Sequence, residues 1–328
     1  MKFNITRAGH IEFRCTDLDR AREFYVDILG FVESDRDSER LYLRGLEGRE
    51  HHGLVLRKAE SPGVSHIAFR VANPDDLDKL AELYQEQGRP IRWMPAGYEK
   101  GQGKALRVQD PSGLPLEFYH EMAGDRWLLQ HFELYRGANV MRLDHFNCQV
   151  SEVQNAYDWF TKKLGFYTSE VTVTEDSPPC LWAAWLHRKQ NVHDLALMNG
   201  IGPRLHHAGF WLADQASVLR ACDVLAATGY ADCIERGPGR HGISNAFFVY
   251  LRDPDGNRIE LYTNDYMIPD PDWEPIQWSI NDPRRATFWG HKPPASWFDE
   301  ASLVESIESG ELMPTYPPPL KDRPEFVT

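Results

Sequence analysis

The chain has 328 residues, 42% of them hydrophobic and 26% charged, which is the composition of a folded globular protein and not of a disordered one. Acidic residues (49) outnumber basic residues (36), and the formal net charge of −13 disfavours binding to nucleic acid or to anionic membranes. No apolar stretch is long enough to span a bilayer, the first residues lack a signal-peptide pattern, and the five cysteines show no paired spacing, so we expect a cytoplasmic protein.

Residues 9–31 have the pattern of a strand followed by a helix. An alternating run at 9–13 leads into an amphipathic stretch, which ends at Leu29-Gly30-Phe31. The alternation predicts a strand, the amphipathic stretch a helix, and Gly30 the C-terminal cap of that helix. Short strands are predicted next, at residues 40–44 and 53–57.

The following segment repeats this plan and adds a turn. A strand at residues 65–71 precedes a helix at 74–87, which is closed by Gly88. The sequence Asp110-Pro111-Ser112-Gly113 is typical of a tight turn, and it introduces an alternating strand at 115–119.

The second half of the chain repeats both segments. The histidine and the helix-closing glycine are 20 residues apart in each copy, from His10 to Gly30 and from His145 to Gly165. We read this as an internal duplication. The second copy predicts strands at 181–186, 194–198 and 206–212, a helix at 215–228 closed by Gly229, and a strand at 258–262 after Asp253-Pro254-Asp255-Gly256.

The repeating unit is therefore a strand, a helix and two or three further strands, present four times. This order of elements predicts an α+β fold. We expect one domain at residues 1–135 and a second at 136–270. Residues 271–328 form a tail rich in proline and tryptophan, which has enough aromatic side chains to pack on the protein but too many prolines to fold alone.

His145, His207 and Glu260 lie where predicted strands of the second copy begin or end. Two imidazoles and one carboxylate are the ligand set of divalent iron or manganese, and they leave one face of an octahedron open. The first copy has His10, His66 and Glu117 at the same three places, and His52 and His193 each stand 14 residues before a second histidine. Each copy therefore contains one candidate metal site.

The neighbouring residues favour the second copy as the metal site. Counting back from the two turns, Tyr250 and His241 stand where the first copy has Arg107 and Tyr98. Two residues after the first histidine, the second copy has Asn147 and the first has Glu12. Because neutral or switchable groups that move protons surround only the second set, we predict metal there and a metal-free first domain.

Several segments resemble the type I extradiol ring-cleaving dioxygenases of the vicinal oxygen chelate superfamily. The resemblance covers nearly the whole chain and is densest at residues 140–265. It implies paired βαβββ modules, two in each domain, and Fe(II) or Mn(II) bound by His145, His207 and Glu260. The segments that carry it are Arg142-Leu143-Asp144-His145-Phe146-Asn147, 183–190, Val192-His193-Asp194, 202–207, 234–242 and 253–262.

The resemblance also implies the reaction and the residues that assist it. The substrates would be a catechol and O2, and the ring would open to a muconic semialdehyde during the breakdown of aromatic compounds. His193 would be the acid–base residue near O2, Tyr250 and His241 would hydrogen-bond the catechol oxygens, and Asn147 would lie near the O2 side. A homotetramer is the expected assembly.

Two arginines would select the substrate. Arg236 and Arg285, or its neighbour Arg284, match carboxylate-binding positions, which implies 3,4-dihydroxyphenylacetate or a similar carboxylated catechol. Trp185 would form a wall of the pocket. The alternatives are cleavage of a neutral catechol, a glyoxalase-type isomerase, and a metal-free binding protein built from the same modules.

Overall fold

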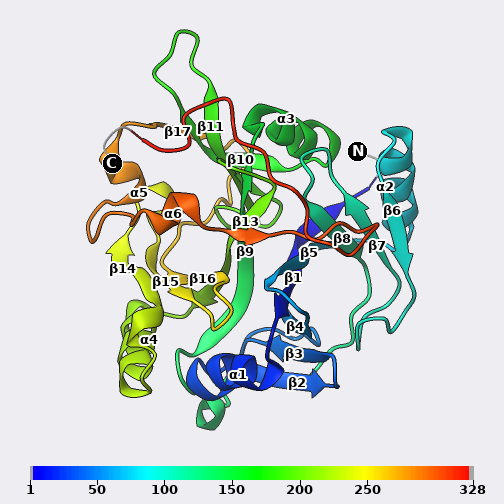
Figure 1. Ribbon diagram of the computed structural model, residues 1–328, viewed down its shortest axis with the longest axis vertical. Coiled ribbons are helices and arrows are strands. Elements are labelled where there is room, and N and C mark those ends of the chain that lie inside the picture. Colours follow the sequence, from blue (N-terminus) through cyan, green and yellow to red (C-terminus); the bar gives the residue numbers. More distant parts are fainter. Residues whose placement is uncertain (1–2, 325–328) are drawn as a thin grey trace.

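The computed structural model describes residues 3–324, and its strands form two sheets that lie side by side (Figure 1). The first sheet has eight strands in the order β2-β3-β4-β1-β5-β8-β7-β6. The second has ten, in the order β14-β15-β16-β13-β9-β12-β11-β10-β17, with β18 paired to β13. In this described part of the chain, no helix is both long and apolar enough to cross a membrane.

The first sheet takes all its strands from residues 5–119, inside the predicted first domain. The predicted helix after the first strand is a short α-helix that continues as a wider π-helix. The elements are β1 (Ile5–Cys15), α1 (Leu18–Arg22), the π-helix η1 (Glu23–Ile28), β2 (Val32–Arg36), β3 (Arg40–Arg44), β4 (Leu54–Lys58), β5 (Gly63–Val71), α2 (Asp75–Glu86), β6 (Ile91–Met94), β7 (Ala105–Gln109) and β8 (Pro115–Tyr119).

The second sheet repeats this series after a connection that contains a short 3-10 helix, η2 (Phe132–Leu134). The elements are β9 (Val140–Val150), α3 (Val153–Asp158), the π-helix η3 (Trp159–Lys163), β10 (Tyr167–Val173), β11 (Leu181–His187), β12 (Leu195–Asn199), β13 (Arg204–Leu212), α4 (Gln215–Ala227), the 3-10 helices η4 (Ala231–Cys233) and η5 (Ile243–Asn245), β14 (Ile234–Arg240), β15 (Phe247–Arg252) and β16 (Arg258–Thr263).

The two sheets have the same pairing pattern. In the first, β1 runs antiparallel to β5 and parallel to β4, and β5 runs parallel to β8. In the second, β9 runs antiparallel to β13 and parallel to β12, and β13 runs parallel to β16. The predicted α+β fold of paired βαβββ modules is thereby confirmed.

One continuous apolar core joins the two sheets. Phe69 of β5 is fully buried, and its ring lies 5.7 Å from that of Phe146 in β9 and 5.5 Å from that of Phe166. Phe31 packs edge-on against Phe210 at 5.0 Å across the same boundary. Because dense packing fixes neighbouring elements, this core holds the two sheets in one orientation.

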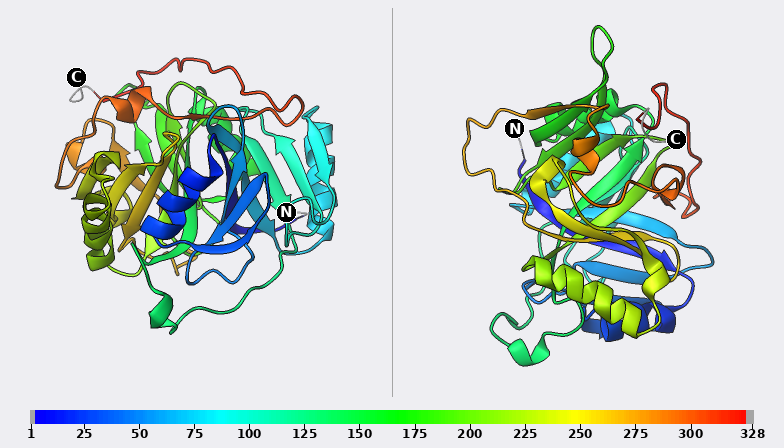
Figure 2. Two further views of the ribbon diagram at one scale, coloured as in Figure 1. Left: turned by 60° about the horizontal axis from the view of Figure 1, so that its bottom comes forward. Right: turned by 90° about the vertical axis from the view of Figure 1, so that its left-hand side faces the viewer.

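Residues 271–324 of the tail pack along both sheets instead of standing apart (Figure 2). Its first strand, β17 (Ile276–Ser279), pairs with β10, and β18 (Ser302–Leu303) pairs with β13. Val304 forms a bridge to Val64 in the first sheet. Two short helices, α5 (Pro283–Ala286) and α6 (Ser296–Asp299), lie between these strands and bury Arg285, Trp297 and Phe298.

Replacing Phe69 by alanine tests how strongly the core couples the sheets. We expect Phe69→Ala to lower the free energy of unfolding by about 3–5 kcal/mol, because it leaves a cavity between buried rings. The measurement is urea unfolding followed by tryptophan fluorescence. Phe132→Ala removes the same atoms from a side chain that is 72% exposed, and it should change stability by less than about 0.5 kcal/mol. Equal effects of the two substitutions would contradict this account.

Candidate functional site

Three neighbouring strands present His145, His207 and Glu260 on one face of the second sheet. Gly209 of β13 pairs with His145 of β9 on one side and with Glu260 of β16 on the other. His207 stands two residues before Gly209, and side chains two residues apart on a strand point to the same face. The strand register therefore brings together the three residues that the sequence predicted as metal ligands.

Their donor atoms converge in a buried space. His145 Nε2 lies 3.0 Å from Glu260 Oε2 and 3.3 Å from His207 Nε2, and His207 Nε2 lies 3.2 Å from the same carboxylate oxygen. All three side chains are buried. An ion bound between these atoms would take two imidazole nitrogens and one carboxylate oxygen, which is a set that Fe(II) and Mn(II) accept.

The protonation of the cluster also suits a cation. Burial alone would lower the pKa of His145, but Asp144 and Glu260 raise it to about 9. Burial opposes the charge of Glu260 as well, yet the two histidines hold its pKa well below the usual range. Without an ion the site therefore keeps a proton between His145 and Glu260, and a divalent cation would take the place of that proton.

Because Gly209 has no side chain, the ring of His145 can lie directly against it. A Cβ atom at this position would come within 2.2 Å of His145 Cε1 and 2.3 Å of His145 Nε2. Such contacts are far inside van der Waals distance, so any side chain here would displace the ring. The glycine is needed for close approach, and not for an unusual backbone angle.

A chain of hydrogen bonds fixes the proton on His207. The carbonyl oxygen of Trp297 in α6 can only accept, so His206 Nε2, 3.0 Å away, is the donor. His206 Nδ1 is then an acceptor, and it receives the Nδ1 proton of His207 at 2.7 Å. This leaves a lone pair on His207 Nε2, the atom that faces Glu260. The tail thus sets the tautomer of a predicted metal ligand.

Behind His145 lies a second buried carboxylate. Asp144 Oδ2 is 3.5 Å from His145 Nδ1 and accepts hydrogen bonds from the Tyr262 hydroxyl at 2.5 Å and from Asn191 Nδ2 at 2.8 Å. Burial disfavours its charge, but Lys189 and His145 lower its pKa far below the usual range. The carboxylate is therefore ionised and makes the His145 ring a stronger ligand.

Tyr250 and His241 form a second hydrogen-bonded pair beside the cluster. The carbonyl of Ala286 accepts from His241 Nδ1 at 2.5 Å, so His241 Nε2 carries a lone pair and accepts from the Tyr250 hydroxyl at 2.9 Å. Burial and the charge of Arg236 lower the pKa of His241 to about 3, which keeps it neutral. The pair lies against the carboxylate, with His241 Nε2 3.8 Å from Glu260 Oε1.

His193 and Asn147 line the same cavity as the cluster. His193 lies in the loop before β12, which begins at residue 195 where the sequence predicted a strand from 194, and its ring centre is 3.9 Å from that of His145. Burial and the nearby His145 hold its pKa well below the usual range. In the described chain, His193 Nδ1 and Asn147 Oδ1 are buried without hydrogen-bond partners.

Two buried arginines, Arg236 and Arg285, line the same cavity. Arg236 Nη2 donates to the carbonyl of Ala286 and to Thr287 Oγ1, each at 2.8 Å, whereas its Nε and Nη1 and the Nε of Arg285 are buried without partners among residues 3–324. Burial lowers the pKa of both guanidinium groups to about 10, so both stay charged at neutral pH. No carboxylate of the described chain pairs with either.

Trp185 and aromatic residues of the tail complete the wall. Trp185 is buried and lies in an apolar cluster with Trp182 and Met198, so it is both a core residue and a lining residue. Arg284, the alternative to Arg285, is exposed and pairs with Asp282, and it does not line the cavity. The predicted residues that line the cavity are His145, Asn147, Trp185, His193, His207, Arg236, His241, Tyr250, Glu260 and Arg285.

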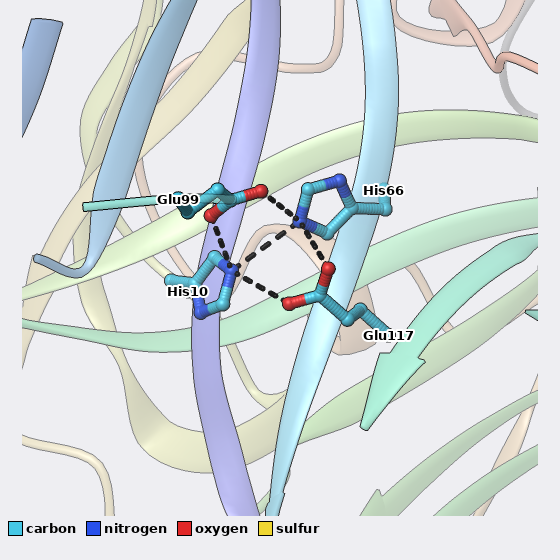
Figure 3. Close-up of side chains that lie close together, drawn as sticks. All are labelled: His10, His66, Glu99 and Glu117. Atoms are coloured by element: carbon cyan, nitrogen blue, oxygen red, sulfur yellow. Dashed lines mark hydrogen bonds and ion pairs between the residues drawn. The ribbon is translucent and has the colours of Figure 1, made fainter. Parts of the chain in front are cut away.

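The first domain contains a matching cluster with one residue that the sequence analysis missed. Figure 3 shows His10, His66, Glu99 and Glu117 pointing toward one another, and all four are buried. Glu99 makes an ion pair with Arg107, whose guanidinium carbon also lies 5.4 Å from the ring centre of Tyr98. Counting back from the turn placed Tyr98 opposite His241, and no ligand was predicted in the loop between β6 and β7, where Glu99 lies.

Other residues of the site were also missed, for different reasons. His206 and Asp144 were visible only as neighbours of ligands, and their roles depend on partners that are distant in sequence. Trp297 belongs to the tail, where the predicted site position was Arg285 or Arg284, and no role was predicted for Trp297 itself. A sequence of adjacent histidines, His206-His207, was the one local signal for the tautomer chain.

Comparisons with known proteins agree with this geometry. The pattern of the Glyoxalase/Bleomycin resistance protein/Dioxygenase superfamily matches residues 7–118 and 142–261. Over 303 residues, 88% of this chain and 95% of the relative, the sequence is 35% identical to a manganese-dependent 2,3-dihydroxybiphenyl 1,2-dioxygenase of Geobacillus genomosp. 3. A metapyrocatechase of Pseudomonas sp. strain CF600 is 33% identical over 88% of this chain and 95% of its own.

Solved structures show the same fold at higher identity. Homoprotocatechuate 2,3-dioxygenase from Arthrobacter globiformis superposes with a TM-score of 0.91 at 42% identity, covering 95% of this chain and 96% of that one. A variant of homoprotocatechuate 2,3-dioxygenase from B. fuscum in complex with HPCA superposes with a TM-score of 0.93 at 40% identity, covering 97% of this chain and 87% of that one.

Replacement of His206 tests the tautomer chain. We expect His206→Leu to weaken Mn(II) binding by about 10–100-fold, because His207 would no longer be held with its lone pair on Nε2. His206→Gln keeps an acceptor for His207 and a donor for the Trp297 carbonyl, so it should recover much of that loss. The measurement is competition titration against a metal chelator. A folded His206→Leu protein with unchanged affinity would refute this role.

Proposed function

The chain belongs to the Glyoxalase/Bleomycin resistance protein/Dioxygenase superfamily and, within it, to the metal-dependent extradiol dioxygenases, and we propose that its substrate is a carboxylated catechol such as 3,4-dihydroxyphenylacetate. The observation that carries the proposal is the pair of buried guanidinium groups, Arg236 and Arg285, which lack a carboxylate partner in the described chain. Buried charges are normally paired, so these two favour an anionic ligand.

His145, His207 and Glu260 would hold Fe(II) or Mn(II). When bound, the ion supplies a Lewis-acidic, redox-active centre that favours loss of a catechol proton and passes electrons between the substrates. The three strands that carry the ligands hold them on one face of the sheet, and all three ligand side chains are buried. The substrate ring would lie between the ligand cluster and the two arginines, in contact with the wall that includes Trp185.

Tyr250 and His241 would position the catechol and accept its proton. The Tyr250 hydroxyl donates its own proton to His241 Nε2, so the lone pairs of the hydroxyl oxygen are free to accept a hydrogen bond from the substrate. Neutral His241 can then take up a proton that Tyr250 passes on. The carbonyl of Ala286 holds the His241 ring in the tautomer that this transfer needs.

His193 and Asn147 would serve the O2 side. His193 is neutral, lies against the ring of His145, and has one nitrogen without a partner in the described chain, so it can accept and return a proton during oxygen insertion. Asn147 follows His145 by two residues on β9 and faces the same cavity. Its amide can orient a small ligand by hydrogen bonding, without adding charge.

Cleavage of a neutral catechol is the second candidate. The relative at 35% identity is named as a 2,3-dihydroxybiphenyl 1,2-dioxygenase, and the relative at 33% identity as a metapyrocatechase. Neither name refers to a carboxylated substrate. The relatives and structures compared above are dioxygenases, so the isomerase and binding-protein alternatives lose their support. The homotetramer and the cytoplasmic location stay predictions.

Substitution of Arg236 separates the two candidates. We expect Arg236→Met to lower kcat/KM for 3,4-dihydroxyphenylacetate by about 10–100-fold, since a hydrogen bond to a charged group contributes about 1.5–3 kcal/mol. The value for 4-methylcatechol should change little. Initial rates of O2 uptake with each catechol give the ratio.

Arg284→Met is the matched control, because it removes a neighbouring arginine that is exposed and paired with Asp282. It should leave both rates unchanged. A similar loss for both catechols in Arg236→Met, or a wild-type enzyme that prefers the neutral catechol, would contradict the carboxylate proposal.

Substitution of Glu260 tests the metal set itself. We expect Glu260→Gln to lose bound Fe or Mn and at least a thousandfold of ring-opening activity, because the cluster loses its anionic ligand. Metal content by mass spectrometry and absorbance of the yellow product are the measurements. Glu311→Gln alters an exposed glutamate of the tail and should retain both. Full activity in Glu260→Gln would exclude this residue as a ligand.

A further inference from the structure

The first domain has the same set of metal-binding side chains as the second, two histidines and a glutamate, and it has one further glutamate, Glu99. His10 Nε2 lies 3.3 Å from His66 Nε2, 3.2 Å from Glu99 Oε2 and 3.3 Å from Glu117 Oε1. His66 Nε2 lies 3.4 Å from Glu99 Oε1 and 3.6 Å from Glu117 Oε2. Figure 3 shows the two carboxylates on opposite sides of the imidazole pair. The set of two nitrogens and two carboxylates matches the chemistry of a divalent transition metal.

The difference between the clusters is a fixed positive charge. Arg107 Nε donates to Glu117 Oε2 at 2.7 Å, and Arg107 Nη2 makes a short ion pair with Glu99 Oε1. Arg107 as a whole is 8% exposed, so this contact is largely shielded from water. Both carboxylates are bound to one cation that belongs to the chain.

The register places this cation where the second domain has a neutral group. Arg107 of β7 pairs with Glu117 of β8, and Tyr250 of β15 pairs with Glu260 of β16 in the same way. Among the described residues, Glu260 has ion-pair contacts with histidines and with no lysine or arginine. One strand position thus decides whether the buried carboxylate faces a permanent cation or a phenol.

Some polar atoms in and beside the cluster have no hydrogen-bond partner. His10 Nδ1, His52 Nε2 and Glu99 Oε2 are buried and accept or donate no hydrogen bond within residues 3–324. Glu99 Oε2 is also 3.3 Å from His52 Nε2. A polar atom left unpaired in a buried site costs free energy, so the geometry points to a ligand set that is not fully satisfied by Arg107.

We propose that the first domain holds a latent divalent-metal site, made of His10, His66, Glu99 and Glu117, in which the Arg107 guanidinium occupies the place of the ion. An ion entering the wild-type cluster would have to break both carboxylate contacts and leave a buried guanidinium unpaired. That loss is severe in a low-dielectric interior, so the native chain takes no metal here. Removal of the guanidinium leaves two buried carboxylates that a divalent ion would neutralise.

The test is the number of Co(II) ions bound per chain, measured by mass spectrometry and by the visible spectrum of bound Co(II). We expect Arg107→Met to bind one ion more than the wild type, whatever number the wild type binds. The difference in bound Co(II) between Arg107→Met and the wild type does not depend on the site in the second domain. If the proposed function fails because that site binds no metal, the wild type will contain no Co(II), and this result is separate from the difference. Ring-opening activity should persist in Arg107→Met.

Two controls assign the extra ion. Arg107→Lys keeps the positive charge and should bind no extra Co(II). The double variant His66→Ala/Arg107→Met removes one ligand and should return to the wild-type number. An extra ion in either control would overturn the proposal, because the ion would then not depend on the charge or on this ligand set.

Folding is followed in the same samples, because Arg107→Met leaves buried carboxylates without a counter-ion. Saturating Co(II) should raise the Tm of Arg107→Met more than that of the wild type. Arg107→Gln, which retains hydrogen bonding to the carboxylates, is the second variant. The proposal is overturned if either variant folds without gaining an ion, or if neither folds in saturating Co(II).

Discussion

A carboxylate buried between two imidazoles is the constraint on which both halves of the molecule depend. Strand register puts Glu117 beside His10 and His66, and Glu260 beside His145 and His207. Removing such a charge from water is costly unless a cation balances it. The first domain supplies that cation from its own chain as Arg107. The second supplies only Tyr250 at this position, so its carboxylate is left for an ion from solution.

The same argument applies, with opposite charge, to two arginines that line the cavity. Arg236 and Arg285 are buried cations with no anion of the described chain to balance them. One group of residues that line the cavity therefore favours a cation and another group favours an anion, and the lining also includes aromatic rings. A flat ring with oxygens at one edge and a carboxylate at the other would match this distribution of charge. Specificity would then follow from electrostatic balance more than from shape.

Much of the fold was predictable because the sequence pattern of each module is repeated along the chain. The duplicated spacing of His10 and His145 to their glycines predicted the modules, and the three ligands followed from their equivalent places in strands. Glu99 was not predictable in this way, since it lies in a loop whose length differs between the copies. The role of Trp297 was beyond reach for another reason: it acts through a backbone carbonyl, which every residue has, so the side chain gives no signal.

The hydrogen bond from His206 to Trp297 spans 91 residues of sequence and has a consequence for biosynthesis. The histidines and Glu260 leave the ribosome before α6 does, so a nascent chain presents its ligands before the carbonyl that orients one of them. Iron or manganese captured at that stage would meet a His207 ring free to adopt either tautomer. The hydrogen bond that fixes the tautomer of His207 can therefore form only after the tail has been translated and has packed against the sheet.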